Sequence, residues 1–290
     1  ACYGVVQRFR STEEESLYGL GQYQTGGVDR KRDTVLLLQA NKEIVNPYAV
    51  STRGYGVLWD NPSASEFRDA GACFEFESEV ADAVDYWFVR GDDPADCVRG
   101  YRELTGAASL PPKWVFGFWQ SKERYKSVDE LEEVVHEYRR RNIPLDVIVQ
   151  DWEYWGDKPR WNALLWDSVR FPEPARSIAR LHETGGVRLM LSVWPGFGPQ
   201  TAVYRDLERA GALFDERTWA GYKVFDAFDP AARDIFWEHF SRGLLSTGVD
   251  GWWMDATEPS FREGFTQRRQ EERTKSAGRT AWGAFHRYLN

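Results

Sequence analysis

Short apolar runs alternate with helical patterns over the second half of the chain, and this alternation constrains the fold more than any other feature. The apolar runs, which we predict to be strands, lie at 114–121, 145–150, 188–194 and 251–254. Strands that are joined through helices run parallel, and runs that are apolar on both faces suit a buried parallel sheet. A (β/α)8 barrel fits this pattern, but only about half of one is present, since a full barrel takes about 250 residues.

The helical patterns between these runs carry their own start signals. Ser127 and Glu130 form a capping box of the S-x-x-E type, and apolar residues follow at helical spacing up to Tyr138. Pro174 and Pro230 each stand at a first helical position, where proline is favoured. We therefore expect one helix between each pair of successive parallel strands.

The chain has a different character before residue 110. Short runs of alternating polarity are separated there by turn residues, and we predict antiparallel strands at 34–38, 55–59, 73–77 and 84–89. A helix is expected over 94–104, opened by Pro94, and the stretch Leu110–Pro112 is typical of a linker. The sequence therefore predicts two structural units of different class.

Composition and charge exclude several classes of protein. The net charge of −8 and the pI of about 5.2 disfavour binding to nucleic acid or to anionic membranes. No apolar run approaches the roughly 18 residues that a membrane-spanning helix needs. Three scattered cysteines without a CxxC pair argue against a zinc or disulfide framework. No signal peptide is visible, so the compartment stays open, with the cytoplasm slightly favoured.

Motifs for cofactors are missing from the sequence as well. The chain has no GxxxxGK and no GxGxxG after a predicted strand, so nothing supports a nucleotide site. The four histidines all fall on predicted helices, away from the strand ends: His136, His182, His239 and His286. This placement argues against a His-metal hydrolase and against a Ser-His-Asp triad. We expect neither a cofactor nor a metal ion.

Carboxylates and tryptophans gather where the predicted parallel strands end. Asp151 and Asp255 directly follow apolar runs, each beside a Trp, in a chain that has 14 Trp. Active groups collect at this edge of a parallel sheet. A lone Asp there is most often a helix cap or turn residue, and a single Trp is most often core. The coincidence of both favours a sugar pocket, because carboxylates bind hydroxyls or attack an anomeric carbon and indoles cover the C–H face of the ring.

Residues 251–258 (GWWMDATE) resemble the nucleophile motif of glycoside hydrolase family 31. The resemblance extends in collinear order over nearly the whole chain, through 18–21, 54–57, 116–122, 149–157 and 194–198. The QDW sequence at 150–152 and the WPGF sequence at 194–197 are most similar to the α-xylosidase-like members of that family. The resemblance therefore rests on several motifs.

The resemblance implies a fold of class α/β. An N-terminal antiparallel β-sandwich portion is expected over residues 1–106, followed over 107–290 by the first half of a (β/α)8 TIM barrel, the catalytic domain. The region 198–228 matches the place where the family inserts a subdomain after the third barrel strand.

The resemblance further implies retaining, exo-acting hydrolysis of α-linked xylosides or glucosides from non-reducing ends, without a metal or cofactor. The expected partner is an oligosaccharide or a small glycoside. Asp255 would be the nucleophile that forms a covalent β-glycosyl intermediate, and Asp151 would accept hydrogen bonds from hydroxyls of the non-reducing sugar. The remaining implied site residues are indoles that contact the sugar and a carboxylate that supports the motif: Trp119, Trp152, Trp194, Trp253 and Glu258.

One part of the family's machinery has no match. The family's acid/base Asp lies beyond the fourth barrel strand, and the carboxylates after Asp255, such as Glu258 and Glu263, match no such motif. We therefore expect a fragment that is weakly active or inactive alone, with exposed sheet edges that promote self-association. One alternative is a non-catalytic carbohydrate-binding or assembly protein made of a half barrel, and another, within the family, is α-glucosidase, transglycosylase or lyase chemistry.

Overall fold

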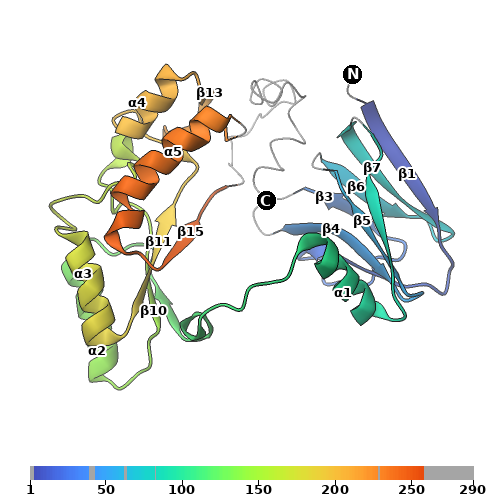
Figure 1. Ribbon diagram of the computed structural model, residues 1–290, viewed down its shortest axis with the longest axis horizontal. Coiled ribbons are helices and arrows are strands. Elements are labelled where there is room, and N and C mark those ends of the chain that lie inside the picture. The colour runs from blue at the N-terminus through green and yellow to red at the C-terminus, as the bar shows by residue number, and fades with distance from the viewer. Residues whose placement is uncertain (1–2, 39–42, 62–63, 82, 228, 258–290) are drawn as a thin grey trace. The chain divides into compact units, whose positions relative to one another are not determined.

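The structure, a computed structural model, describes residues 3–38, 43–61, 64–81, 83–227 and 229–257. These residues form two compact units, one that runs to Ser109 and one that begins at Leu110 (Figure 1). The first contains antiparallel sheets, and the second contains a parallel sheet with helices between its strands. The predicted fold class, an antiparallel β portion followed by part of a TIM barrel, is confirmed.

The first unit is built from two four-stranded antiparallel sheets with the strand orders β1-β7-β6-β3 and β2-β4-β5-β8. The strands are β1 (Tyr3–Arg10), β2 (Leu17–Gln22), β3 (Thr34–Leu37), β4 (Ile44–Ser51), β5 (Tyr55–Trp59), β6 (Ser65–Asp69), β7 (Cys73–Ala81) and β8 (Tyr86–Arg90). One apolar core draws on both sheets, and in it Trp59 of one sheet stacks on Phe76 of the other at 5.4 Å between ring centroids. The Trp59 Nε1 donates to the Ser78 hydroxyl at 2.8 Å, so the buried indole keeps a polar partner.

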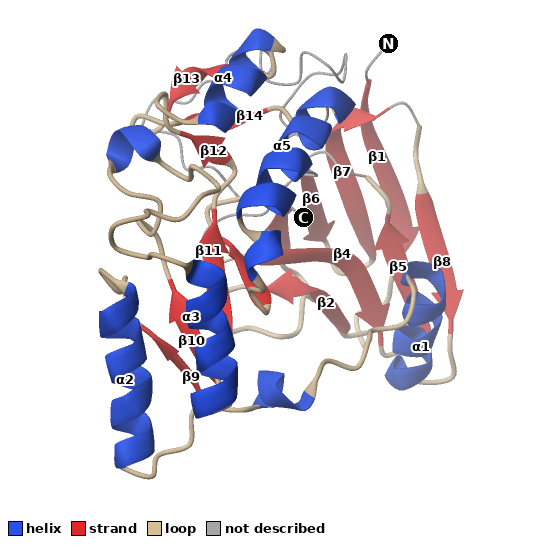
Figure 2. Ribbon diagram, turned by 60° about the vertical axis from the view of Figure 1, so that its left-hand side comes forward, coloured by secondary structure: helices blue, strands red, loops and turns tan. Residues whose placement is uncertain are grey.

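Helix α1 (Pro94–Thr105) packs against β4, β5 and β8 (Figure 2). Its first turn is capped by the Asp93 carboxylate, which accepts from the backbone N–H of Asp96. The Tyr48 hydroxyl donates to the carbonyl of the buried Cys97 at 2.7 Å, and this bond ties the helix to β4.

The second unit holds a four-stranded parallel sheet in the order β9-β10-β11-β15. The strands are β9 (Trp119–Ser121), β10 (Val147–Gln150), β11 (Arg188–Val193) and β15 (Gly251–Met254). Spatial order follows chain order, as in consecutive βα units of a barrel. In the described part of the chain, β9 and β15 stand at the two ends of this sheet. Self-association through these edges stays a prediction.

Helices separate the parallel strands, and a small antiparallel sheet, β12-β14-β13, follows β11. The helices are α2 (Val128–Arg140), α3 (Pro174–Arg180), α4 (Ala202–Arg209) and α5 (Pro230–Gly243), with short helical turns η1 (Lys113–Phe116), η2 (Lys158–Arg160), η3 (Leu181–Gly185) and η4 (Leu245–Thr247). The small sheet consists of β12 (Gly196–Phe197), β13 (Leu213–Arg217) and β14 (Lys223–Phe225). Figure 2 shows it beyond the arrowhead of β11. None of the helices in the described ranges is long and apolar enough to cross a membrane.

The predicted capping box at the start of α2 is present in a shifted form. The Ser127 hydroxyl accepts from the backbone N–H of Glu130 at 3.2 Å. The Glu130 carboxylate accepts from the backbone N–H of Lys126 at 2.6 Å, one residue before the cap. Two backbone N–H groups at the start of α2 therefore have side-chain acceptors.

The predicted strand over 114–121 is wrong in its first half. Lys113–Phe116 forms a 3₁₀ turn, in which the N–H of Gly117 donates to the carbonyl of Trp114 at 3.1 Å. The backbone N–H groups of Val115 and Gly117 donate within this turn rather than to a neighbouring strand, and Phe116 is 71% exposed. The strand proper is β9, which begins at Trp119.

Candidate functional site

Two aspartates stand at the carboxyl edge of the parallel sheet. Asp151 directly follows β10 and Asp255 directly follows β15, with β11 between these two strands. Neighbouring strands lie about 4.8 Å apart, so the backbones of β10 and β15 are roughly 10 Å apart. The two aspartates therefore flank the end of β11.

The two aspartates share one local contact, a hydrogen bond from the next backbone amide. The Asp151 Oδ1 accepts from the N–H of Trp152 at 2.7 Å, and the Asp255 Oδ1 accepts from the N–H of Ala256 at 2.8 Å. A left-handed residue follows in each turn, at different offsets: Glu153, at φ 62°, is two residues after Asp151, and Ala256, at φ 50°, is one residue after Asp255. Non-glycine residues are uncommon in this conformation, and such backbone strain gathers at functional sites. The bond to the next amide limits how each carboxylate can rotate.

Burial and charge act together on Asp151. Burial raises the pKa of the Asp151 carboxyl to about 6, and the negative charge of Asp255 acts in the same direction. The N–H of Trp152 and the hydroxyl of Ser192 hydrogen-bond to the carboxylate and oppose this rise. The influence of Asp255 on this pKa indicates that the two carboxyl groups lie close enough to interact.

Ser192 is a site residue that sequence reasoning missed. It is buried on β11, level with Trp253 of β15, and its hydroxyl accepts from the Trp194 Nε1 at 3.2 Å. The same hydroxyl hydrogen-bonds to Asp151. Ser192 thus links a carboxylate and an indole of the expected site. This role follows from the place of its strand, β11, between β10 and β15.

The indoles of Trp152 and Trp194 meet on a third indole. The buried Trp161 lies 5.3 Å from Trp152 and 5.0 Å from Trp194, measured between ring centroids. The neighbouring Asn162 donates to the carbonyl of Trp194 at 2.6 Å and fixes that turn. Sequence reasoning missed Trp161 because it lies in a loop, away from any predicted strand end. Trp161 holds two expected sugar-contacting rings in one aromatic cluster.

Arg124 also reaches this edge from the loop after β9. Its guanidinium pairs with Glu153 at 2.8 Å and lies over the Trp152 ring, 4.6 Å from the ring centroid. The pair with Glu153 fastens the turn that carries Asp151. Nothing in the sequence pattern indicated this contact.

The structure does not bring Trp119 to the carboxyl edge, which corrects the expectation that this residue ends a strand beside the site. Trp119 is the first residue of β9 and pairs with Val147, the first residue of β10. Asp151 follows four residues after Val147, a distance of about 13 Å along a strand. The Trp119 Nε1 donates to the carbonyl of Val115 at 3.1 Å, so the indole is tied back to the 3₁₀ turn. The turn that replaces the first half of the predicted strand is the reason for the error.

Trp253 and Glu258 complete the expected set. Trp253 lies on β15, two residues before Asp255, and 40% of its surface is exposed. Glu258 lies outside the described residues. Within the described ranges, no group of three or more His, Cys, Asp or Glu side chains could hold a metal ion.

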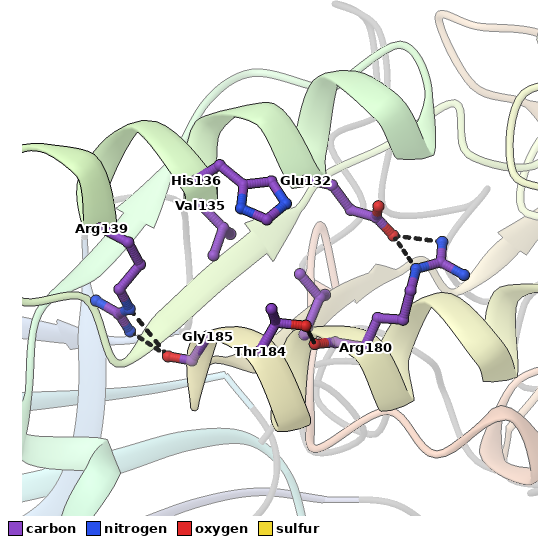
Figure 3. A pocket seen from close by; sticks show the side chains of 8 residues that line it. Glu132, Val135, His136, Arg139, Arg180, Thr184 and Gly185 are labelled. Carbon is purple, nitrogen blue, oxygen red and sulfur yellow. Dashed lines mark hydrogen bonds and ion pairs between the residues drawn. The ribbon is translucent and has the colours of Figure 1, made fainter.

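A separate pocket lies between α2 and η3 in the outer helical layer (Figure 3). Arg180 at one end of this pocket pairs with Glu132 at 2.6 Å. Arg139 at the other end donates to the carbonyls of Gly185 and Leu145. Leu145 precedes β10, so this end of the pocket lies toward the amino edge of the sheet, opposite to Asp151. Both arginines have protein partners, and we assign the pocket no part in the site.

Comparison with protein families matches residues 108–288 to the model described as the glycosyl hydrolases family 31 TIM-barrel domain. Among curated proteins, the chain is 41% identical over 266 residues to an alpha-xylosidase of Saccharolobus solfataricus, an alignment that covers 89% of this chain and 35% of the relative. It is 28% identical over 259 residues to alpha-xylosidase A of Aspergillus niger, covering 85% of this chain and 35% of the relative. The chain thus spans about a third of the length of these relatives.

Among solved structures, two GH31 alpha-xylosidases are similar to this chain. A GH31 alpha-xylosidase from a soil metagenome, complexed with xylose, aligns with a TM-score of 0.83 at 31% identity and covers 98% of this chain and 47% of that chain. The GH31 alpha-xylosidase of Xanthomonas citri aligns with a TM-score of 0.87 at 26% identity and covers 98% of this chain and 48% of that chain.

Proposed function

Because the chain belongs to glycosyl hydrolase family 31, we propose that it provides the nucleophile side of the active site of a retaining, exo-acting α-glycosidase that prefers α-xylosides. The observation that carries this proposal is the pair Asp151 and Asp255, set on either side of β11 at the carboxyl edge of the sheet. Four of the matched relatives bear the name alpha-xylosidase, which supports the preference for xylose.

In the proposed reaction, Asp255 is the nucleophile. Its carboxylate oxygen attacks the anomeric carbon, the bond to the leaving-group oxygen breaks, and that oxygen takes a proton from a general acid. Water then attacks the resulting glycosyl ester and releases the sugar with its original configuration. No described residue is assigned as the acid.

Asp151 binds the sugar in this proposal. A carboxyl with a pKa of about 6 is mostly ionised at pH 7, so Asp151 accepts hydrogen bonds from sugar hydroxyls. The Trp152, Trp194 and Trp253 indoles border the same space and cover the C–H face of the ring. Trp119 has no part in this proposed subsite because of its place at the start of β9.

Turnover by matched variants tests the proposal. In the complete gene product that contains this sequence, Asp255→Asn is expected to lower kcat/KM for an aryl α-xyloside by about 10⁴-fold or more, because the nucleophile is lost. The control Asp129→Asn changes an exposed carboxylate on α2 and is expected to leave turnover unchanged. Equal turnover by the parent and Asp255→Asn would overturn the assignment. A parent that cleaves aryl α-glucoside faster than aryl α-xyloside would overturn the substrate preference alone.

A further inference from the structure

The turn between β13 and β14 presents an indole to solvent. Trp219 stands in this turn and is 48% exposed. The turn itself is well bonded, since the N–H of Thr218 donates to the carbonyl of Tyr222 at 2.9 Å and the N–H of Gly221 donates to the carbonyl of Thr218 at 3.0 Å. Trp219 is therefore an exposed indole on a turn that is held by backbone hydrogen bonds.

Trp219 is connected to the aromatic cluster of the candidate site. Its ring centroid lies 5.7 Å from that of the buried Trp161, with the two planes at 82°. Trp161 in turn contacts Trp152 and Trp194. Trp219 thus contacts the same buried ring as Trp152 and Trp194, but Trp219 is exposed, whereas those two indoles are half-buried. The Lys158 ammonium lies 5.7 Å from the Trp219 ring centroid and adds a hydrogen-bond donor beside it.

We propose that Trp219 is a specificity-determining contact for the leaving group, and that this group is a sugar. An exo-acting enzyme holds the terminal sugar in its inner subsite, so the leaving sugar extends outward, where the indole face of Trp219 covers its C–H face and Lys158 meets its hydroxyls. The substrate class is then an α-linked disaccharide or longer oligosaccharide, in preference to a glycoside with a small leaving group. This inference rests on the proposed glycosidase function.

A pair of substrates isolates this contact in the complete gene product. An α-linked xylosyl disaccharide reaches the outer site, whereas α-xylosyl fluoride has a leaving group too small to touch Trp219. For Trp219→Ala, the ratio of kcat/KM for the disaccharide to kcat/KM for the fluoride is expected to fall about tenfold, the effect of one lost stacking contact. Trp219→Phe, which keeps an aromatic face, is expected to restore most of that ratio.

Trp237→Ala is the matched control. Trp237 is an indole on α5 that is 57% exposed and packs on Phe240, and its removal is expected to leave the ratio unchanged. An unchanged ratio in Trp219→Ala overturns the inference, and so does an equal loss for both substrates, which indicates a structural role. If the parent cleaves neither substrate, the proposed function itself fails and the inference falls with it. If the parent cleaves both substrates but Trp219→Ala does not lower the ratio, the proposed function stands and this inference alone fails.

Discussion

The aspartates at the two edges of the parallel sheet differ in their partners. At the amino edge, Asp250 accepts from the N–H of Leu189 at 2.9 Å and pairs with His182 at 2.7 Å and with Arg188 at 3.3 Å. At the carboxyl edge, Asp151 has no ion pair among the described residues, and burial raises its pKa to about 6. At the amino edge, the carboxylate of Asp250 has side-chain partners. At the carboxyl edge, burial and the charge of Asp255 disfavour the ionised form of Asp151. This difference supports the proposal that the carboxyl edge is the site of the reaction, and we expect the amino edge to serve the stability of the fold.

After the loss expected for Asp255→Asn, the next largest effect is expected for the other aspartate of the carboxyl edge. Asp151→Asn keeps the shape of the side chain but removes the charge that accepts from sugar hydroxyls. We expect kcat/KM for an aryl α-xyloside to fall about 100-fold in the complete gene product, because a hydrogen bond to a charged group contributes about 1.5–3 kcal/mol. Steady-state kinetics measure this loss. A decrease of less than threefold would remove Asp151 from the substrate site.

The matching change at the amino edge is expected to act on stability. Asp250→Ala leaves the N–H of Leu189 and the side chains of His182 and Arg188 without their shared carboxylate. We expect the free energy of unfolding to fall by about 2 kcal/mol, with kcat/KM of the remaining folded enzyme within twofold of the parent. Denaturant unfolding and kinetics check the two halves of this prediction. A large loss of kcat/KM in well-folded Asp250→Ala would contradict the division between the edges.

The smallest effect is the response of stability to pH. Because the pKa of Asp151 is higher in the folded protein than in the unfolded chain, the folded state binds the extra proton, and stability falls as the pH rises from about 4 to about 6. Asp151→Asn lacks this penalty. We expect it to be more stable than the parent at pH 8 by about 1 kcal/mol, a figure reduced for partial solvent exposure, and to lose this advantage near pH 4.

Melting temperatures of both proteins from pH 4 to pH 8 give the comparison. The advantage of the variant corresponds to about 2–4 °C at pH 8. A constant difference across this range would mean that the pKa of Asp151 is not raised in the folded protein.

Much of the fold could be predicted from local patterns. The capping signals at Ser127 and the proline at 174 mark helix starts, and the apolar runs before Asp151 and Asp255 are strands. The error over 114–121 arose because Trp114–Phe116 is as apolar as a strand, while its hydrogen bonds close within the turn. Apolar character alone does not distinguish these two states.

The candidate site was only partly predictable for a different reason. Asp151 and Asp255 directly follow strands, so their common edge could be expected from topology. Ser192, Trp161 and Arg124 owe their roles to partners that are far away in sequence or that lie on the neighbouring strand. No periodicity or motif encodes such contacts, and they appear when the strands and loops are placed in space.

Covalent labelling identifies the nucleophile without reference to rates. A xylose-configured cyclophellitol aziridine is opened by the carboxylate that attacks the anomeric position and stays attached to it as an ester. After incubation with the complete gene product, proteolysis and mass spectrometry of the peptides locate the adduct. We predict one label, on Asp255, and none in Asp255→Asn. An adduct on Asp151 or on any other carboxylate would contradict the assignment of Asp255.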